Sequence, residues 1–131
     1  MNAQLQVTLS SFGFKYGVPP EATVIWDVRF LPNPYWVEEM RHKTGLEREV
    51  ADYVLESPAA IQFLRLIEPL LLFLVQENLA GGKQQELWLA VGCTGGRHRS
   101  VAVVEALKSL LAGKVSLTVL HRDIERDSSA Q

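Results

Sequence analysis

Alternating and continuous runs of apolar residues predict four β-strands along this chain. Residues 5–12 alternate between apolar and polar side chains, which is typical of a strand with one covered face. Residues 22–30 are more continuously apolar and predict a second, more buried strand. Residues 86–92 and 115–120 predict the third and fourth strands.

Helix signals lie between these strands. Residues 46–55 predict a short helix. The pair Ser57-Pro58 predicts the start of a second helix, because serine caps a helix and proline suits its first position. This helix should run to about Leu79, with Gly81-Gly82 ending it, and Pro69 should kink or divide it. A last helix is expected over residues 96–111.

This order of elements predicts a single α/β domain with a small, mostly parallel four-stranded sheet flanked by helices. A helix between two strands favours parallel neighbours. We assign residues 1–126 to the domain and expect residues 127–131 to form a disordered tail. Because ligands collect at the carboxyl ends of parallel strands, the residues that follow the second and third strands should meet at one rim.

Composition narrows the class of protein. One cysteine excludes a disulfide framework within the chain and a multi-cysteine metal site, and the sequence predicts no cofactor and no metal. The longest apolar run, residues 64–75, is interrupted by Arg65, Glu68 and Pro69, so we expect no membrane span. The first residues lack a signal-peptide pattern, which predicts a cytoplasmic protein.

Charge is distributed unevenly along the chain, although the net charge is only −2. Residues 38–86 hold nine acidic and five basic residues, whereas residues 93–122 hold five lysines and arginines against one acid. Such an asymmetry indicates either a positive surface for a polyanion or solvated charge on unrelated surfaces.

The segment Cys93-Thr94-Gly95-Gly96-Arg97-His98-Arg99 carries the strongest chemical signal. It joins a buried strand to a helix, where free backbone amides and the helix dipole attract anions. Arg99 stands in the first helical turn and could bind two phosphate oxygens at once. The sequence therefore predicts a phosphate-binding loop.

One alternative for this loop is catalytic. Cys93 and Arg99 match the Cys-x5-Arg spacing of cysteine-dependent phosphatases, with Ser100 placed to assist the leaving thiolate and Asp27 a candidate general acid. Against it, Gly92 stands where that loop usually has a histidine. Cys93 could equally be a small buried residue at a strand end.

A resemblance covers nearly the whole chain. It rests on residues 11–17, 27–34, 44–46, 92–100 and 121–123, which occur in this order. Together they resemble the C-terminal domain of the RapZ/YvcJ family of bacterial nucleotide-binding proteins. Members of that family also have an N-terminal P-loop domain, but this chain has no G-x-x-x-x-G-K-[ST] motif, so that activity is not implied here.

The resemblance implies binding of small regulatory RNA and sensing of an amino-sugar phosphate. The implied ligand residues are Asp27, Arg29, Tyr35, Cys93, Thr94, Gly95, Gly96, His98 and Arg99. Tyr35 stands where the enterobacterial relatives carry a histidine, and a phenol carries no positive charge near neutral pH.

The predicted RNA contacts are basic residues near the ends of the strands, and some of them could instead be solvated surface charge. They are Lys15, Arg97, His121, Arg122 and Arg126. Expected partners are therefore a phosphorylated sugar or another small phosphate ligand, a small RNA, and a P-loop domain or other protein partner. A pure protein-interaction module with a vestigial anion loop is the remaining alternative.

Overall fold

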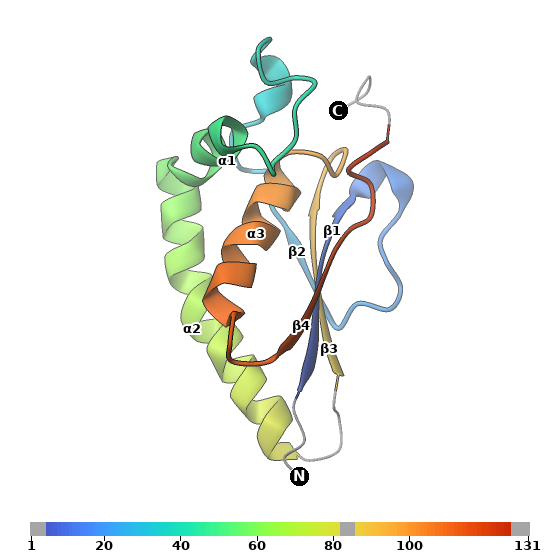
Figure 1. Cartoon of the computed structure of the whole chain (residues 1–131), viewed down its shortest axis with the longest axis vertical. Helices are drawn as coiled ribbons and strands as arrows, with labels where there is room; N and C mark the ends of the chain where they lie inside the picture. Colours follow the sequence, from blue (N-terminus) through green and yellow to red (C-terminus); the bar gives the residue numbers. More distant parts are fainter. Residues whose placement is uncertain (1–4, 82–85, 127–131) are drawn as a thin grey trace.

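The computed structural model describes residues 5–81 and 86–126 (Figure 1). Its strands are β1 (Gln6–Gly13), β2 (Val24–Asp27), β3 (Glu86–Cys93) and β4 (Ser116–His121). Its helices are α1 (Arg48–Leu55), α2 (Pro58–Gly81) and α3 (Arg99–Leu111), with 3₁₀ turns at Phe14–Tyr16 and Pro34–Trp36. The tail expected at residues 127–131 and the predicted helix stop at Gly82 lie outside the described residues.

All four strands run parallel in one sheet, in the order β2-β3-β1-β4. The central strand β1 places Leu9 opposite Leu89 of β3 and opposite Val119 of β4. The predicted small α/β domain is confirmed, and its sheet is wholly rather than mostly parallel.

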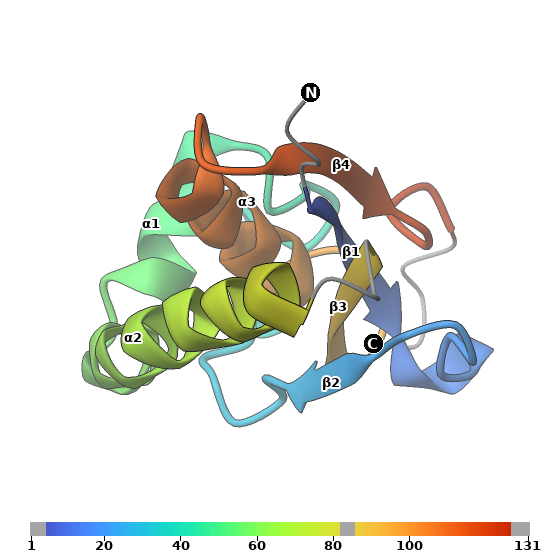
Figure 2. The ribbon, with the colours of Figure 1, turned by 90° about the horizontal axis from the view of Figure 1, so that it is seen from below.

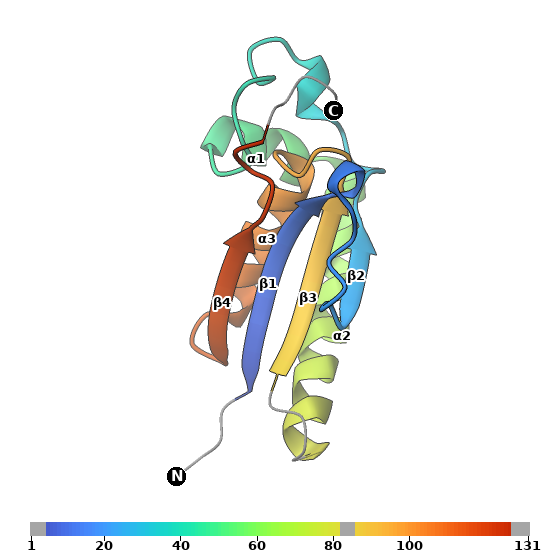
Figure 3. The same ribbon diagram turned by 90° about the vertical axis from the view of Figure 1, so that its right-hand side faces the viewer.

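The three helices lie on one face of the sheet, as Figure 2 shows. The core lies between these two layers, where Val7, Leu9, Leu89, Val104 and Leu107 are each at most 1% exposed. The connection from β1 to β2, residues 14–23, crosses the opposite face (Figure 3). The molecule therefore has two full layers and a sheet face covered only in part by a loop.

Strand β2 is shorter and more exposed than the sequence predicts. Only residues 24–27 of the expected 22–30 form strand, and Ile25 is 41% exposed. The reason is position, because β2 is an edge strand that pairs with β3 alone. Val24 and Trp26 pack against the core, and Ile25 and Asp27, which alternate with them, face outward.

Helix α2 begins as predicted and continues through its proline. The Ser57 hydroxyl accepts a hydrogen bond from the Ala60 amide at 3.2 Å, and Pro58 is the first helical residue. Pro69 does not divide the helix. It is exposed, so the hydrogen bond that it removes is lost on the solvent side, where water can replace it.

The length and composition of α2 would allow it to cross a membrane, which the sequence analysis did not expect. An 18-residue window of this helix has a mean hydropathy of 1.7 and is 22% buried. This is weak evidence, because a helix that packs on a sheet meets the same criterion. Here Ile67, Leu71 and Val75 pack into the core.

Candidate phosphate-binding rim

The carboxyl ends of the four strands lie at one edge of the sheet, because the strands are parallel (Figure 3). We call this edge the rim; it comprises Gly13, Lys15 and residues 27–29, 93–99 and 121–126. The helix α3 also begins there, at Arg99. The two charged clusters predicted to meet do so, since Arg99 Nη1 donates a hydrogen bond to the Arg29 carbonyl at 2.6 Å.

The loop between β3 and α3, residues 94–98, leaves its backbone amides available. None of these five amides donates a hydrogen bond to another described residue. His98, at the start of α3, provides no side-chain cap, so the amides of the first helical turn are open as well. Successive free N–H groups at the positive end of a helix favour an anion.

Gly95 and Gly96 also allow the loop to pack closely against the end of β1. A Cβ at Gly96 would lie 2.6 Å from the Gly13 amide nitrogen, and one at Gly13 would lie 2.4 Å from the Gly95 carbonyl carbon. Gly96 also has φ +81°, which side chains rarely allow. The end of β1 therefore packs backbone to backbone against the loop. The sequence analysis missed Gly13 as the partner.

Arg99 is a buried guanidinium with no carboxylate within ion-pair distance among the described residues. Its Nη1 donates to the carbonyls of Arg29 and Leu31 at 2.6 and 3.4 Å, and its Nη2 to the Thr94 hydroxyl at 3.3 Å. Its Nε is buried without a hydrogen bond, and the residue is 4% exposed. Burial lowers the pKa of Arg99 from its usual value, yet an arginine stays charged.

This arrangement restricts how Arg99 can hold a phosphate. A two-point contact would use Nε and Nη2, with Nη2 exchanging the Thr94 hydroxyl for a phosphate oxygen and with movement of the groups that cover the buried Nε. The hydrogen bonds from Nη1 to the two backbone carbonyls would remain. Arg99 can therefore brace the end of β2 and bind an anion together.

Asp27 and Arg29 form an ion pair with each other. Arg29 Nη2 lies 2.6 Å from Asp27 Oδ2, and the Arg29 guanidinium carbon lies 4.0 Å from the centre of the Phe14 ring. The hydrogen bond from Arg29 lowers the pKa of Asp27 below 3.8, so this carboxylate is ionised at neutral pH. Both side chains are almost half exposed, which leaves them accessible to a ligand.

Tyr35 lies in the 3₁₀ turn that follows the end of β2. The Asn33 side chain accepts a hydrogen bond from its amide at 3.1 Å, and the Arg41 guanidinium lies 5.0 Å from its ring centre. Tyr35 is half-buried, so its phenol remains a candidate hydrogen-bonding group beside the rim.

Cys93 is 1% exposed, and its Sγ lies 3.1 Å from Ser100 Oγ. This contact is the one that the phosphatase alternative expects. Its proposed general acid is less suitable, because Asp27 has a lowered pKa and lacks a proton to donate at neutral pH. The structure therefore places Cys93 and Ser100 as the phosphatase alternative expects, but it gives that alternative no protonated general acid at Asp27.

Arg97 connects the loop to two other segments through hydrogen bonds. Its Nη1 donates to the carbonyls of Ile124 and Arg126, and its Nη2 donates to the His42 carbonyl at 3.2 Å. Predicted as an RNA contact, Arg97 thus has both Nη groups engaged by backbone carbonyls.

His98 is buried below the loop at 1% exposure. Its Nε2 lies 3.2 Å from the Arg41 carbonyl, and its Nδ1 makes no hydrogen bond to a described residue. Burial lowers the pKa of His98, and the nearby Arg97 and Arg99 lower it further, so the imidazole is neutral near pH 7. His98 is therefore buried beneath the loop, and its role as a ligand residue stays a prediction.

Asp123 is the residue of the rim that sequence reasoning did not assign a role. It is fully buried and accepts hydrogen bonds from the Gly13 amide at 2.8 Å, from Arg122 at 2.9 Å and from Arg126 at 2.9 Å. Burial alone would raise the pKa of Asp123, but the Arg122, Gly13 and Arg126 hydrogen bonds outweigh it and leave the pKa below 3.8. The sequence signal that could have indicated this role is an acidic residue with Arg122 and Arg126 on either side.

The remaining predicted RNA residues divide into two groups. Lys15 is exposed, and its amide donates to the Thr94 carbonyl at 3.2 Å, so it lies at the rim. His121 faces the helix layer instead: its Nδ1 lies 2.7 Å from Ser11 Oγ and its Nε2 2.9 Å from a Glu105 carboxylate oxygen. With 12% of its side chain exposed, His121 offers little surface for an RNA contact.

One known protein family matches nearly the whole of this chain. The model of the RapZ C-terminal domain matches residues 5–125. The chain belongs to the RapZ C-terminal domain family. The resemblance in the sequence is thereby confirmed, and the rim contains most of the motifs on which it rested.

Similar proteins are named nucleotide-binding proteins. One from Mycobacterium leprae is 50% identical over 128 residues, which cover 96% of this chain and 43% of that protein. One from Caldicellulosiruptor saccharolyticus is 48% identical over 122 residues, covering 92% of this chain and 41% of that protein. The chain thus spans less than half the length of these relatives.

Proposed function

We propose that this domain binds the phosphate group of a small phosphorylated sugar at the rim, as a regulatory and non-catalytic module. The observation that carries the proposal is the buried guanidinium of Arg99, which contacts Thr94 of the β3–α3 loop and has no carboxylate partner among the described residues. A buried charge held by neutral oxygens alone gains stability from an opposite charge. The relatives' name, nucleotide-binding protein, agrees with a phosphate ligand.

An amino sugar is the preferred ligand class because of the second charge at the rim. The ionised Asp27 carboxylate lies near Arg99 and is accessible to solvent. It could accept hydrogen bonds from an ammonium group while the loop holds the phosphate. Tyr35 adds a neutral hydrogen-bonding group rather than a cation.

The direct test is a titration of the isotope-labelled chain with glucosamine-6-phosphate, followed by backbone amide NMR. We expect saturable shifts concentrated at Thr94 to Arg99 and around Asp27. Shifts confined to other parts of the chain, or no saturable shifts, would contradict the assignment of the site.

Arg99→Met tests the guanidinium contact, and its free energy of unfolding is measured alongside because Arg99 also holds the carbonyls of Arg29 and Leu31. It should weaken glucosamine-6-phosphate binding by roughly 10- to 100-fold, because charge-assisted hydrogen bonds contribute about 1.5–3 kcal/mol. The matched control is Arg48→Met, which removes the same charge from a side chain that is 94% exposed on α1. Equal affinity in the two variants would refute the role of Arg99.

The rival phosphatase function makes an opposite prediction. It requires turnover of a phosphate ester that disappears in Cys93→Ser. We expect no turnover by the wild-type chain with glucosamine-6-phosphate or p-nitrophenyl phosphate. Hydrolysis that depends on Cys93 would overturn the non-catalytic proposal.

Basic residues beside the loop support RNA binding as a second candidate. Lys15, Arg122 and Arg126 lie at the rim with exposed or part-exposed side chains. If they contact an RNA backbone, affinity for a labelled oligoribonucleotide should fall steeply with added salt. The slope of log affinity against log salt concentration should decrease in magnitude by about one unit in Lys15→Gln. It should stay unchanged in Lys114→Gln, because Lys114 lies at the opposite end of the sheet. An interaction insensitive to salt would exclude this surface.

A further inference from the structure

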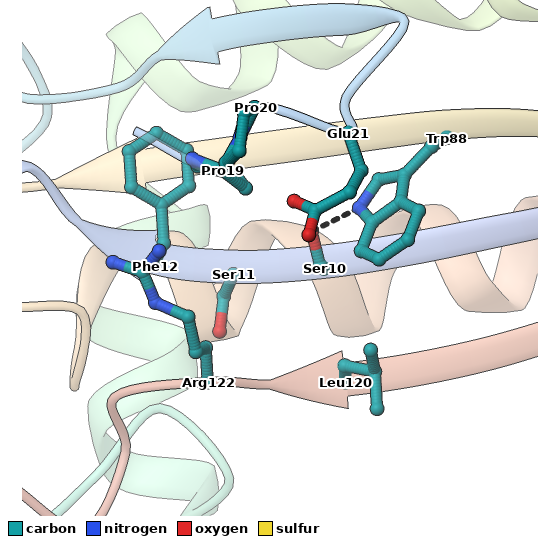
Figure 4. Close-up of a pocket in the computed structure, with 9 residues that line it drawn as sticks. All are labelled: Ser10, Ser11, Phe12, Pro19, Pro20, Glu21, Trp88, Leu120 and Arg122. Atoms are coloured by element: carbon teal, nitrogen blue, oxygen red, sulfur yellow. Dashed lines mark hydrogen bonds between the residues drawn. The ribbon is translucent and has the colours of Figure 1, made fainter. Parts of the chain in front are cut away.

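A cavity of about 240 Å³ lies on the face of the sheet opposite the helices, and no predicted ligand residue of the β3–α3 loop lines it (Figure 4). Strands β1, β3 and β4 form its floor, and the connection between β1 and β2 forms a wall. Its lining residues include Phe12, Pro19, Pro20, Glu21, Trp88 and Arg122.

The apolar part of this cavity is flat and held in place. The Trp88 indole Nε1 donates a hydrogen bond to Ser10 Oγ at 2.8 Å, which fixes the ring orientation. The two prolines have rigid rings and stand across from the sheet. An aromatic ring with a fixed orientation beside rigid apolar walls suits a planar ligand that stacks.

Two charged groups line the cavity: in Figure 4 the Glu21 carboxylate is drawn near the Trp88 indole and the Arg122 guanidinium near the Phe12 ring. The Glu21 carboxylate is exposed and makes no hydrogen bond or ion pair to another described residue. Arg122 uses Nε and Nη2 for Asp123 and the Gly17 carbonyl, and its Nη1 has no hydrogen-bond partner in the described part of the chain. The cavity therefore offers a pair of acceptors from Glu21 and a donor from Arg122.

We propose that this cavity binds a single guanine base. Guanine carries N1–H and N2–H donors side by side, which match the two oxygens of Glu21, and acceptors at O6 and N7, which arginine commonly binds. Adenine has no such pair of adjacent donors, and in uracil the one ring N–H lies between two carbonyls that repel a carboxylate. The volume is below the usual range of about 300–1,000 Å³ for sites that enclose a drug-sized ligand. The cavity therefore takes the base and leaves the ribose outside.

The base can come from a free guanine nucleotide or from single-stranded RNA, in which bases stack on aromatic side chains and are read along their edges. The proposal does not rest on the phosphate site, because guanosine itself has no phosphate. Failure of the loop to bind glucosamine-6-phosphate would thus leave this prediction standing.

The test follows the indole N–H resonances of the three tryptophans during a guanosine titration of the full chain. The Trp88 resonance is assigned by its disappearance in Trp88→Phe. We expect a saturable shift of Trp88 with guanosine, and at least tenfold weaker responses with adenosine and uridine. No saturable Trp88 shift up to the solubility limit, or equal responses to the three nucleosides, would overturn the guanine assignment.

Glu21→Gln should remove the preference for guanosine over adenosine while Trp88 keeps its resonance position in the free protein. Glu77→Gln, an exposed change on α2, should leave the preference intact. An unaltered preference in Glu21→Gln would refute the carboxylate contact. Titrations with guanosine monophosphate and with a single-stranded RNA containing one guanine then identify the source, by which of them shifts Trp88 at the lower concentration.

Discussion

The two sides of the rim hold positive charge in different ways. Beside β1 and β4, Arg122 and Arg126 both pair with the buried Asp123 carboxylate. At the start of α3, Arg97 and Arg99 donate to backbone carbonyls and a hydroxyl, and neither forms an ion pair with a described residue. The first set shares one carboxylate within the protein, whereas the second has no carboxylate partner in the described part of the chain and is left for an anion from solution. The partner of an arginine, rather than its burial, decides whether it stabilises the fold or a ligand.

Asp123→Asn removes the carboxylate that Arg122 and Arg126 share and should have the largest effect. The amide keeps the shape of the side chain, but at a fully buried position it replaces the charged acceptor of the Gly13 amide and of two guanidinium groups that are themselves part exposed. We expect the free energy of unfolding in urea to fall by about 4 kcal/mol. Glu125→Gln, on an exposed neighbour, should change it by less than about 0.5 kcal/mol. Similar losses in the two variants would contradict the central position of Asp123.

Gly96→Ala tests the backbone contact that joins the two sides. The new Cβ would meet the Gly13 amide nitrogen at 2.6 Å and would also be held at a positive φ. Strain and overpacking together should cost about 3 kcal/mol of unfolding free energy. Gly113→Ala is the matched control, because its φ is +80° but nothing lies within 4 Å of the added carbon. It should cost only about 1 kcal/mol, and an equal cost at Gly96 would show that the loop can move away from β1.

Local patterns predicted the elements of this fold well and the position of β2 poorly. Strands β1, β3 and β4 lie within about a residue of their predicted ends, since alternation and flanking glycines are properties of neighbouring residues. The apolar run at residues 22–30 could not reveal that its strand lies at the edge of the sheet. Sheet order depends on contacts between strands far apart in sequence. The effect of Pro69 on the helix likewise depends on its surroundings, because a proline is tolerated here where α2 faces solvent.

The candidate site shows the same limit. Residues 93–99 were found because the glycines, basic residues and helix start are contiguous in the sequence. The bond between Asp123 and the Gly13 amide joins residues 110 positions apart, so no local pattern contains it. The partners of His121 could not be predicted for a related reason, since Ser11 and Glu105 lie on β1 and α3.

His98→Asn tests whether protonation of His98 destabilises the α3 side of the rim at acidic pH. The pKa of His98 in the folded chain lies below its usual 6.5, so the unfolded chain binds more protons below that pH. Stability should therefore fall as the pH decreases below about 6.5, by at most about 1.4 kcal/mol per pH unit. Asp123 contributes in a different window, because its stabilisation is lost only as the pH falls through a pKa below 3.8.

Urea unfolding at pH 7.5 and 5.5 separates these two contributions. The loss between the two pH values should shrink in His98→Asn and persist in a variant of the exposed His42, such as His42→Asn. An undiminished loss in His98→Asn would assign the acid sensitivity to another group.

Asp27→Asn has the smallest expected effect on stability and makes the sharpest distinction between ligands. The ion pair with Arg29 is almost half exposed, and such pairs contribute little to folding. Its carboxylate nevertheless compensates part of the positive charge near Arg99, so its removal leaves the α3 side more positive. A ligand with phosphate alone should then bind more tightly, on the order of threefold at low salt, and this gain should disappear as salt screens the charges.

Glucosamine-6-phosphate and glucose-6-phosphate differ by one ammonium group, and Asp27 is the charge proposed to bind it. In Asp27→Asn we therefore expect opposite changes, with weaker binding of glucosamine-6-phosphate and tighter binding of glucose-6-phosphate. Isothermal titration calorimetry with both sugars at two salt concentrations measures these opposite changes in affinity. If both affinities rise together, Asp27 only compensates Arg29 and Arg99, and the rim binds phosphate without recognising the amine. If both fall together, Asp27 is needed to hold Arg29 in place, because losing that ion pair then outweighs the change in net charge.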